Sequence, residues 1–374
     1  MITIGDLQSL LSTHYPAGSA ESWDRVGLVT GNSAEPVRGV LLTVDVTDAI
    51  IEQAAGLDAN LIIAHHPLLL RGVNAIDPKQ PKGRMITRLI RSGTGLITAH
   101  TNADIPVGGV ADSVAAALGL TGTRPLRTVP VQPLDQLITY VPREHTKTVI
   151  DTLSAAGAGA LGSYERAAFT VTGTGTFTPR PGAHPAIGEP GRREQVTEDL
   201  VEMIMDRRVR DQVVAALLAA HPYEVPAYRI VEVAFPVDGG PAAGLGRIGR
   251  IEPITLAGFA DRVASVLPDT AAGIRIAGDR DRVITTVALQ GGAGDDLLDT
   301  ARLAGADVYL TSDLRHHPAS EAVAWEAAPA LIDVPHWAAE WLWLPALQAE
   351  LEDQLPGLPV TVSRIVTDPW TFRI

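Results

Sequence analysis

Histidine and carboxylate residues in this sequence stand at spacings that suit a metal site. His336 and Glu340 are four residues apart, so on a helix they share one face and could bind one ion. His65 and His66 are adjacent at the end of an apolar run and before a proline, so both can face one cavity. Two adjacent imidazoles serve two neighbouring ions better than one, and Asp104 or Glu340 could bridge such ions with two oxygens. Imidazole and carboxylate ligands suit divalent Zn, Fe, Mn or Ni.

Each part of this pattern also has a simpler interpretation. A single histidine near a core is more often hydrogen-bonded than metal-bound, and a single His-x-x-x-Glu on a helix is usually a surface pair. The clustering favours a metal site, because histidine is the commonest metal ligand and six of the ten histidines fall in clusters that follow apolar runs. These six are His65, His66, His100, His316, His317 and His336.

The apolar runs before these clusters predict short buried strands. In the first third, runs at Val40–Val44, Leu61–Ala64 and Gly95–Ala99 alternate with helix-like segments at Asp48–Gly56 and Arg84–Arg91. The last third repeats the pattern, with runs at Val283–Leu289, Val308–Leu310 and Ala330–Ile332. The alternation predicts a sheet covered by helices on both faces. Functional groups gather where the carboxyl ends of such strands meet the following loops, so we expect the polar clusters to converge at one edge.

The middle of the chain predicts a separate small module. Its segments follow in the order βαββαβ, which is the ferredoxin-like pattern. Stretches rich in proline or glycine bound it at Pro125–Pro133 and Gly239–Gly246, and the similar stretch Pro179–Gly191 predicts a loop or flap inside it. The segments are Leu137–Val141, Glu144–Ala155, Ala167–Phe177, Gln195–Met205, Arg210–Ala220 and Ala227–Val233.

These patterns predict an α/β protein of two domains. Residues 1–128 and 244–374 form the two halves of an outer domain, and residues 129–243 form an inserted ferredoxin-like α+β domain. A length of 374 residues agrees with two or three domains at roughly 100–200 residues each.

Composition narrows the functional classes. The formal net charge of −13 makes general nucleic-acid binding unfavourable, although a single nucleotide in a local pocket stays compatible with it. The chain has no cysteine, so a metal site must use histidine and carboxylates. The N-terminus lacks the pattern of a signal peptide, and no run of about 18 apolar residues occurs. We therefore expect a cytoplasmic protein without membrane contact.

Glycine and tryptophan clusters each leave two interpretations open. Gly291–Gly294 follows a predicted strand, and such a loop could cradle an anion at a helix N-terminus or form only a tight turn. Gly244–Gly249 matches GxGxxG formally but lacks the preceding βα context, so it does not predict a dinucleotide site. Trp337, Trp341 and Trp343 could line a pocket or pack in a core or interface.

Taken together, the clusters resemble the Nif-three-like family, also called GTP cyclohydrolase I type 2 homologues. The resemblance spans both halves of the outer domain, and HPYEVPAY at His221–Tyr228 resembles the PII-like insertion of the longer members. The outer motifs are WDRVGL at Trp23–Leu28, AHHP at Ala64–Pro67, HTNAD at His100–Asp104, GLGRIG at Gly244–Gly249, GGAGDD at Gly291–Asp296, TSDLRHH at Thr311–His317 and the final His336-x-x-x-Glu340. The sequence departs from the family at Arg25, Ser312 and Pro335, which bears on the shape of a substrate pocket.

The resemblance implies a dinuclear metal centre inside a three-layer α/β fold. It makes His100 and His317 the next candidates after the main ligands, either as further ligands or as their hydrogen-bond partners. It also implies a toroidal homohexamer, a trimer of dimers, whose openings the insertion would cap. By motif match, the ligands are His65, His66, Asp104, His336 and Glu340.

The function that follows is that of a metal-dependent hydrolase acting on a small molecule. Two metal ions with open positions lower the pKa of a bound water to roughly 7 and stabilise oxyanions. The family name points to GTP as the substrate. Its imidazole ring would be opened by hydrolysis at the carbon between the two nitrogens, with His317 or His100 as the proton carrier. Other amide, ester or phosphate substrates fit the same metals. The alternative is a non-enzymatic metal-binding or regulatory oligomer that uses the PII-like insert for sensing or interaction. A metal-free scaffold is a third interpretation.

Overall fold

The protein contains helices and several sheets, which confirms the predicted mixed α/β class. The computed structural model describes residues 2–129, 134–161, 164–233 and 243–374. The chain divides into two compact units, one joining Met1–Val131 to Gly239–Ile374 and the other formed by Gln132–Asp238. No helix in the described residues has the length and apolar character that a bilayer crossing requires.

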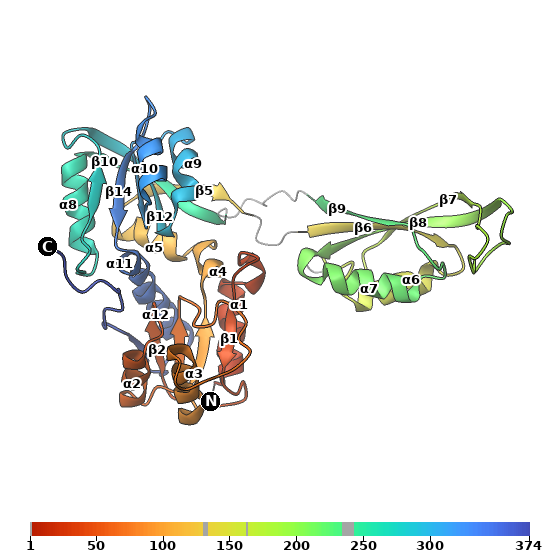
Figure 1. Cartoon of the computed structure of the whole chain (residues 1–374), viewed down its shortest axis with the longest axis horizontal. Coiled ribbons are helices and arrows are strands. Elements are labelled where there is room, and N and C mark those ends of the chain that lie inside the picture. Colours follow the sequence, from red (N-terminus) through yellow and green to blue (C-terminus); the bar gives the residue numbers. More distant parts are fainter. Residues whose placement is uncertain (1, 130–133, 162–163, 234–242) are drawn as a thin grey trace. The chain divides into compact units, whose positions relative to one another are not determined.

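The first sheet of the larger unit has five strands in the order β1-β4-β3-β2-β15 (Figure 1). Strands β2, β3, β4 and β15 run parallel, and β1 is antiparallel to β4 at one edge. Every residue of β2, β3 and β4 is buried, because helices cover both faces of the sheet. The strands are β1 (Gly27–Thr30), β2 (Val40–Thr43), β3 (Leu61–Ala64), β4 (Gly95–Thr98) and β15 (Val360–Val362).

Neighbouring residues of each central strand face different helix layers. Ile63 packs with Leu7 of α1 and Leu347 of α12 on one face, whereas Ile62 packs with Ile50 of α2 on the other face, which α3 also covers. This alternation produces the three layers that the resemblance implied. The helices are α1 (Ile4–His14), α2 (Asp48–Gly56), α3 (Pro81–Ser92) and α12 (Trp343–Gln354).

The second sheet of the larger unit has six strands in the order β11-β14-β13-β12-β10-β5. Its central strands β12, β13 and β14 are parallel, and β10, β5 and β11 pair antiparallel at the two sides. The strands are β5 (Thr121–Thr128), β10 (Gly244–Thr255), β11 (Arg275–Ala277), β12 (Val283–Ala293), β13 (Val308–Ser312) and β14 (Ala330–Val334).

Helices again cover both faces of this sheet. Leu289 packs with Val114 of α5 and Phe259 of α8, and the preceding Ala288 packs with Leu298 of α9 on the opposite face. Two short helices, α4 and α11, begin after β4 and β14. The helices are α4 (Thr101–Asp104), α5 (Val110–Ala117), α8 (Leu256–Val266), α9 (Leu298–Leu303), α10 (His316–Val323) and α11 (His336–Trp341).

The larger unit therefore differs from the prediction in one respect: it contains two sheets, and the polar clusters follow strands of both. Apolar runs identify buried strands but carry no information on which strands pair, which explains the difference. Each sheet also takes an element from the other half of the chain, since β15 and α12 complete the first sheet and β5 forms an edge of the second. Strand β5 occupies part of the Pro125–Pro133 stretch that was expected to form a boundary.

The smaller unit has the element order β6-α6-β7-β8-α7-β9 and an antiparallel sheet in the order β7-β8-β6-β9. Both helices pack on one face, where Leu137, Val141 and Val201 of the sheet contact Val149 and Leu217. Closer likeness to PII proteins stays a prediction. So do the junctions at 128/129 and 243/244, because residues 130–133 and 234–242 lie outside the described residues. The elements are β6 (Leu134–Pro142), α6 (Thr146–Ala155), β7 (Phe169–Phe177), β8 (Glu194–Asp206), α7 (Arg210–Ala220) and β9 (Tyr228–Val233).

Candidate metal centre

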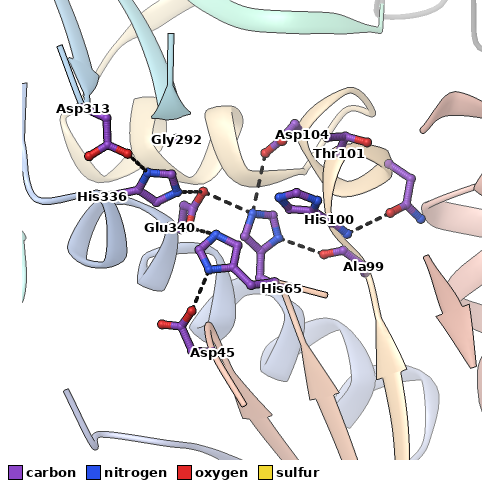
Figure 2. A network of polar contacts seen from close by, with 12 residues as sticks. Asp45, His65, Ala99, His100, Thr101, Asp104, Gly292, Asp313, His336 and Glu340 are labelled. Atoms are coloured by element: carbon purple, nitrogen blue, oxygen red, sulfur yellow. Dashed lines mark hydrogen bonds and ion pairs between the residues drawn. The ribbon is translucent and has the colours of Figure 1, made fainter. Parts of the chain in front are cut away.

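The five predicted ligands meet between the two sheets of the larger unit (Figure 2). His65 and His66 directly follow β3, Asp104 ends α4 after β4, and His336 and Glu340 lie on α11 after β14. Three of the side chains are shielded from solvent, with His65 0%, Glu340 3% and Asp104 8% exposed, whereas His66 and His336 are partly exposed. Strand ends of both sheets thus supply one cluster.

The adjacent histidines both reach the cluster because β3 ends at Ala64. The backbone N–H groups of His65 and His66 still donate to Thr43 and Val44, at 3.0 and 2.8 Å, which fixes the direction of the chain. The two imidazole rings lie 5.2 Å apart between centroids. Two neighbouring side chains that would diverge on a regular strand therefore line the same space.

Glu340 is the centre of the cluster. Its Oε1 lies 2.8 Å from Nε2 of His336 and 3.3 Å from Nε2 of His65, and its Oε2 lies 2.8 Å from Nε2 of His66. Asp104 is more distant, with Oδ1 3.9 Å from Nε2 of His65. Both oxygens of one carboxylate thus contact different imidazoles.

Four histidines of the cluster share one arrangement, in which Nδ1 contacts an oxygen acceptor of the protein. Such an acceptor holds a proton on Nδ1 and directs Nε2 toward the other polar groups of the cluster, as in metal sites where outer partners orient the ligand rings. The pairs are His65 with the Ala99 carbonyl at 2.8 Å, His66 with Asp45 at 2.8 Å, His100 with Asp24 at 2.8 Å and His336 with Asp313 at 2.7 Å.

Several buried polar atoms of the cluster have no hydrogen bond. They are Nε2 of His65 and of His336, Oδ1 of Asp104 and Oε2 of Glu340. Unpaired buried groups cost free energy, and bound cations would satisfy them. The donor set and its geometry therefore fit a divalent metal.

Two groups of three ligand atoms lie within 4.8 Å of one another. One group is His65, His66 and His100, and the other is His66, His336 and Glu340. The groups overlap at His66, so the described residues offer donors for neighbouring positions.

Gly292 of β12 makes room for this arrangement. A Cβ atom at this position would lie 2.6 Å from Oε1 of Glu340 and 3.5 Å from Nε2 of His336. The glycine-rich segment had been interpreted as an anion cradle or a tight turn. At this residue, the close approach of a carboxylate accounts for the glycine.

The charges of the cluster stabilise one another. Burial would lower the pKa of the imidazoles, but the charge of Glu340 and the contacts with Asp45 and Asp313 together outweigh it, which raises the pKa of His66 to about 10 and that of His336 to about 11. Burial would likewise raise the pKa of Glu340, but the positive charges of His336 and His66 hold it well below its usual value. Burial does raise the pKa of Asp104. The site thus holds positive charge beside an ionised carboxylate.

A cavity of about 830 Å³ opens beside the cluster. His66 and His336 line it together with Asp45 and Asp313. Its other walls include Arg275, Arg373, Trp370 and Phe372. The hydroxyl of Thr367 donates to Oδ2 of Asp45 at 2.7 Å, which connects the segment after β15 to the partner of His66. Two of the candidate ligands are therefore accessible to a small molecule.

The remaining candidates take different places. His100 lies inside the cluster, with its ring 5.3 Å from that of His65. His317 is exposed at the start of α10, and no contact with the cluster is found in the described part of the chain. The catalytic roles of both stay predictions.

The three tryptophans near Glu340 belong mainly to the core. Trp337 and Trp343 are buried with the helices of the first sheet, and Trp341 is partly buried there and donates to the Ser363 carbonyl at 2.8 Å. Trp337 also lines the cavity.

Sequence reasoning did not single out the acceptors Asp24 and Asp45. Asp24 is buried and accepts hydrogen bonds from both the backbone and the hydroxyl of Thr101, at 3.0 and 2.6 Å. Burial would raise its pKa, but the hydrogen bonds and the charge of His100 lower it, so it stays an acceptor. A signal was present for Asp45, which directly follows the apolar run of β2, whereas Asp24 lies only within the WDRVGL motif.

The fold and the cluster define an α/β protein in which histidine and carboxylate groups are arranged as metal ligands are. The sequence profile of the Duf34/NIF3 (NGG1p interacting factor 3) family matches residues 2–369, and the chain belongs to this family. The resemblance seen in the motifs is thereby confirmed.

Relatives match over nearly their whole length. A Mycobacterium tuberculosis protein named "GTP cyclohydrolase 1 type 2 homolog" is 45% identical over 374 residues, which cover 99% of this chain and 97% of that protein. A Bacillus subtilis protein of the same name is 37% identical over 96% of this chain and 95% of its own. Among solved structures, a Bacillus cereus protein related to NIF3 is 33% identical with a TM-score of 0.67, covering 100% of both chains. Staphylococcus aureus SA1388 is 28% identical with a TM-score of 0.68, covering 99% of both chains.

Proposed function

We propose that this protein is a metal-dependent hydrolase with a centre of two divalent ions. The observation that carries the proposal is that four imidazoles have Nδ1 held by oxygen acceptors, which directs Nε2 into the cluster that contains Glu340 and Asp104. The two overlapping groups of ligand atoms support two neighbouring ions. Zn, Fe, Mn and Ni all suit these donors. The proposed ligands are His65, His66, Asp104, His336 and Glu340.

The residues of the chain would have different roles in such a site. When bound, the ions would lower the pKa of a water molecule and stabilise an oxyanion. Asp45 and Asp313 orient the two imidazoles that border the cavity. Glu340 is suited to bridge two ions, because its oxygens contact different histidines.

His100 is the proposed proton carrier. Its ring lies 5.3 Å from that of His65 and 5.4 Å from that of His66, and Asp24 holds its Nδ1. An imidazole whose other nitrogen is oriented by a carboxylate suits general acid–base work. His317 is the second candidate, and its exposed position would require the substrate or a neighbouring chain to approach it.

The cavity supports a small substrate with an aromatic ring and an anionic group. Trp370 and Phe372 offer apolar surfaces, and Arg275 and Arg373 offer positive charge. A nucleotide has both features. The names of the relatives support testing GTP first, with hydrolytic opening of its imidazole ring at the carbon between the nitrogens.

We also propose a homohexamer built as a trimer of dimers. The family resemblance suggests this assembly, and exposed apolar side chains on the sheet of the smaller unit support an interface there. Phe169, Val171 and Val231 are 61%, 50% and 44% exposed. Phe169 and Val171 lie on the edge strand β7, and Val231 lies on the other edge strand, β9. Large exposed apolar side chains on one sheet are typical of interaction surfaces. The alternative function is a regulatory oligomer that binds metal without catalysis. It is favoured by a cavity in the smaller unit, which could bind a second small molecule.

Elemental analysis of the purified protein tests the metal proposal. We expect about two ions per chain in the natural protein and a loss of at least one in Glu340→Ala. Glu352→Ala is the matched control, because Glu352 is an exposed residue of α12 that accepts a hydrogen bond from Gln348 at 3.0 Å. Full metal retention in Glu340→Ala would contradict the ligand assignment. Metal binding without hydrolysis of GTP or of a panel of amides, esters and phosphates would favour the regulatory alternative.

A further inference from the structure

A second cavity, of about 670 Å³, lies in the smaller unit. Leu200 of β8 lines it, whereas the next residue, Val201, packs under the helices, so the cavity is on the face of the sheet opposite to α6 and α7. Residues of the Pro/Gly-rich stretch Pro179–Gly191 and of the HPYEVPAY segment complete its walls. A cavity of this size is within the range that holds small molecules.

A buried carboxylate marks the cavity. Glu198 is 8% exposed, and its Oε1 accepts a hydrogen bond from the hydroxyl of Tyr223 at 2.6 Å. Its Oε2 has no hydrogen bond or ion pair within the described ranges, and it lies against Gly175, where a Cβ atom would be 1.9 Å away. A glycine on β7 therefore leaves the space that the free oxygen occupies. Glu224 adds a second carboxylate to the lining.

Positive charge is lacking around this carboxylate. None of the described residues that line the cavity is lysine, arginine or histidine. His221, beside Tyr223, accepts the backbone N–H of Tyr223 at its Nδ1 (3.1 Å), and its Nε2 donates to the Tyr140 carbonyl (2.9 Å). Burial lowers the pKa of His221, which keeps the ring neutral. The cavity is therefore negatively charged and repels anions.

Aromatic side chains supply the remaining chemistry. Tyr140, Phe177 and Tyr223 line the cavity, and the rings of Phe177 and Tyr223 are 5.6 Å apart at an angle of 64°. Aromatic faces together with a carboxylate are how proteins bind ammonium groups. We propose that this cavity binds a small organic cation with an apolar body, whose ammonium group meets Oε2 of Glu198. The site lies in the smaller unit, whereas the candidate metal centre lies in the larger one, and residues of the HPYEVPAY segment form part of its wall.

Three probes with one ring system and different charges test this site on the full-length protein. Calorimetry compares tryptamine, which is a cation, with neutral tryptophol and anionic indole-3-propionate. We expect tryptamine to bind about tenfold more tightly than tryptophol, and indole-3-propionate not to bind at about 1 mM. Glu198→Gln should remove the preference for the cation. Glu202→Gln, on the same strand and face but outside the cavity, should leave it unchanged.

A second variant tests the location without removing a charge. A Cβ atom at Gly173 of β7 would meet nothing within 4 Å, so the side chain in Gly173→Leu extends into the cavity without a backbone clash. This variant should keep its fold and lose all probe binding. The proposal is overturned if the neutral or anionic probe binds as well as tryptamine, if none of the probes binds, or if tryptamine binds equally to both variants and the natural protein.

Discussion

Replacing Gly292 with alanine should damage the metal site and leave the fold intact. The new Cβ atom would lie 2.6 Å from Oε1 of Glu340, which is roughly 0.9 Å shorter than van der Waals contact. The carboxylate is the end of a flexible side chain, so it can move away at little cost to the core. Metal coordination tolerates only about 0.2 Å of deviation in ligand distance, so a displacement of this size removes a good ligand.

The loss of a ligand should weaken binding at least as much as disturbing a group that orients one. Disturbing the groups that orient metal ligands typically weakens affinity by about 10–100-fold, which corresponds to about 1.4–2.8 kcal/mol. Competition with a coloured chelator measures the Zn²⁺ affinity of the variant and of the natural protein. Thermal unfolding of the metal-free proteins, followed by circular dichroism, should show closely similar midpoints.

Gly173→Ala is the matched control, because Gly173 also lies on a strand and a Cβ atom there would meet nothing within 4 Å. Its Zn²⁺ affinity should equal that of the natural protein. If Gly292→Ala binds Zn²⁺ with unchanged affinity, the carboxylate of Glu340 is not a metal ligand in the position described. A large loss of stability in the metal-free variant would show instead that Gly292 serves packing.

Three further predictions concern the surroundings of the centre. Asp45→Ala and Asp313→Ala remove the acceptors of His66 and His336, so each should weaken metal binding about 10–100-fold without preventing folding; unchanged affinity would deny them an orienting role. With pKa values of about 10 and 11, both imidazoles are protonated in the metal-free protein at pH 8, so Zn²⁺ binding should release about two protons. Binding should tighten as the pH rises towards 10. The stability that the protonated rings give the metal-free protein should be lost as the pH rises through these two pKa values. Calorimetry in buffers of different ionisation enthalpy measures this release, and a heat independent of the buffer would contradict it. Replacing Gln132–Asp238 by a short Gly/Ser linker should leave a soluble metal-binding protein, because the flanking strands pair at Thr128 and Gly244; aggregation or loss of metal would count against it.

The sequence predicted the buried strands and the clustering of the candidate ligands for a physical reason. Strands covered on both faces are continuous apolar runs, and Leu61–Ala64 was located to the residue. Polar residues directly after such runs stand out in the sequence, so His65 and His336 could be identified as candidate ligands. The antiparallel strands of the larger unit were not predicted, because their patterns are weaker: β10 contains three glycines and a proline, and β5 is largely exposed.

What the sequence could not supply were relations between distant positions. The division into two sheets depends on which strands pair, and an apolar run does not indicate the strand with which it pairs. Asp24 and His100 are 76 residues apart, and only the fold makes them partners. The role of Gly292 also depends on a contact across the structure, with a carboxylate on α11.

The exchange of elements between the two halves has a consequence for synthesis on the ribosome. Strand β15 and helix α12 are made late, yet they complete the sheet that begins with β1. A nascent chain that has not reached α12 exposes one apolar face of this sheet, which makes it vulnerable to aggregation and a target for chaperones. The chain also lacks two of its five proposed metal ligands until α11 has emerged. Metal uptake would therefore follow translation of nearly the entire protein, and bound metal would distinguish completed molecules from fragments.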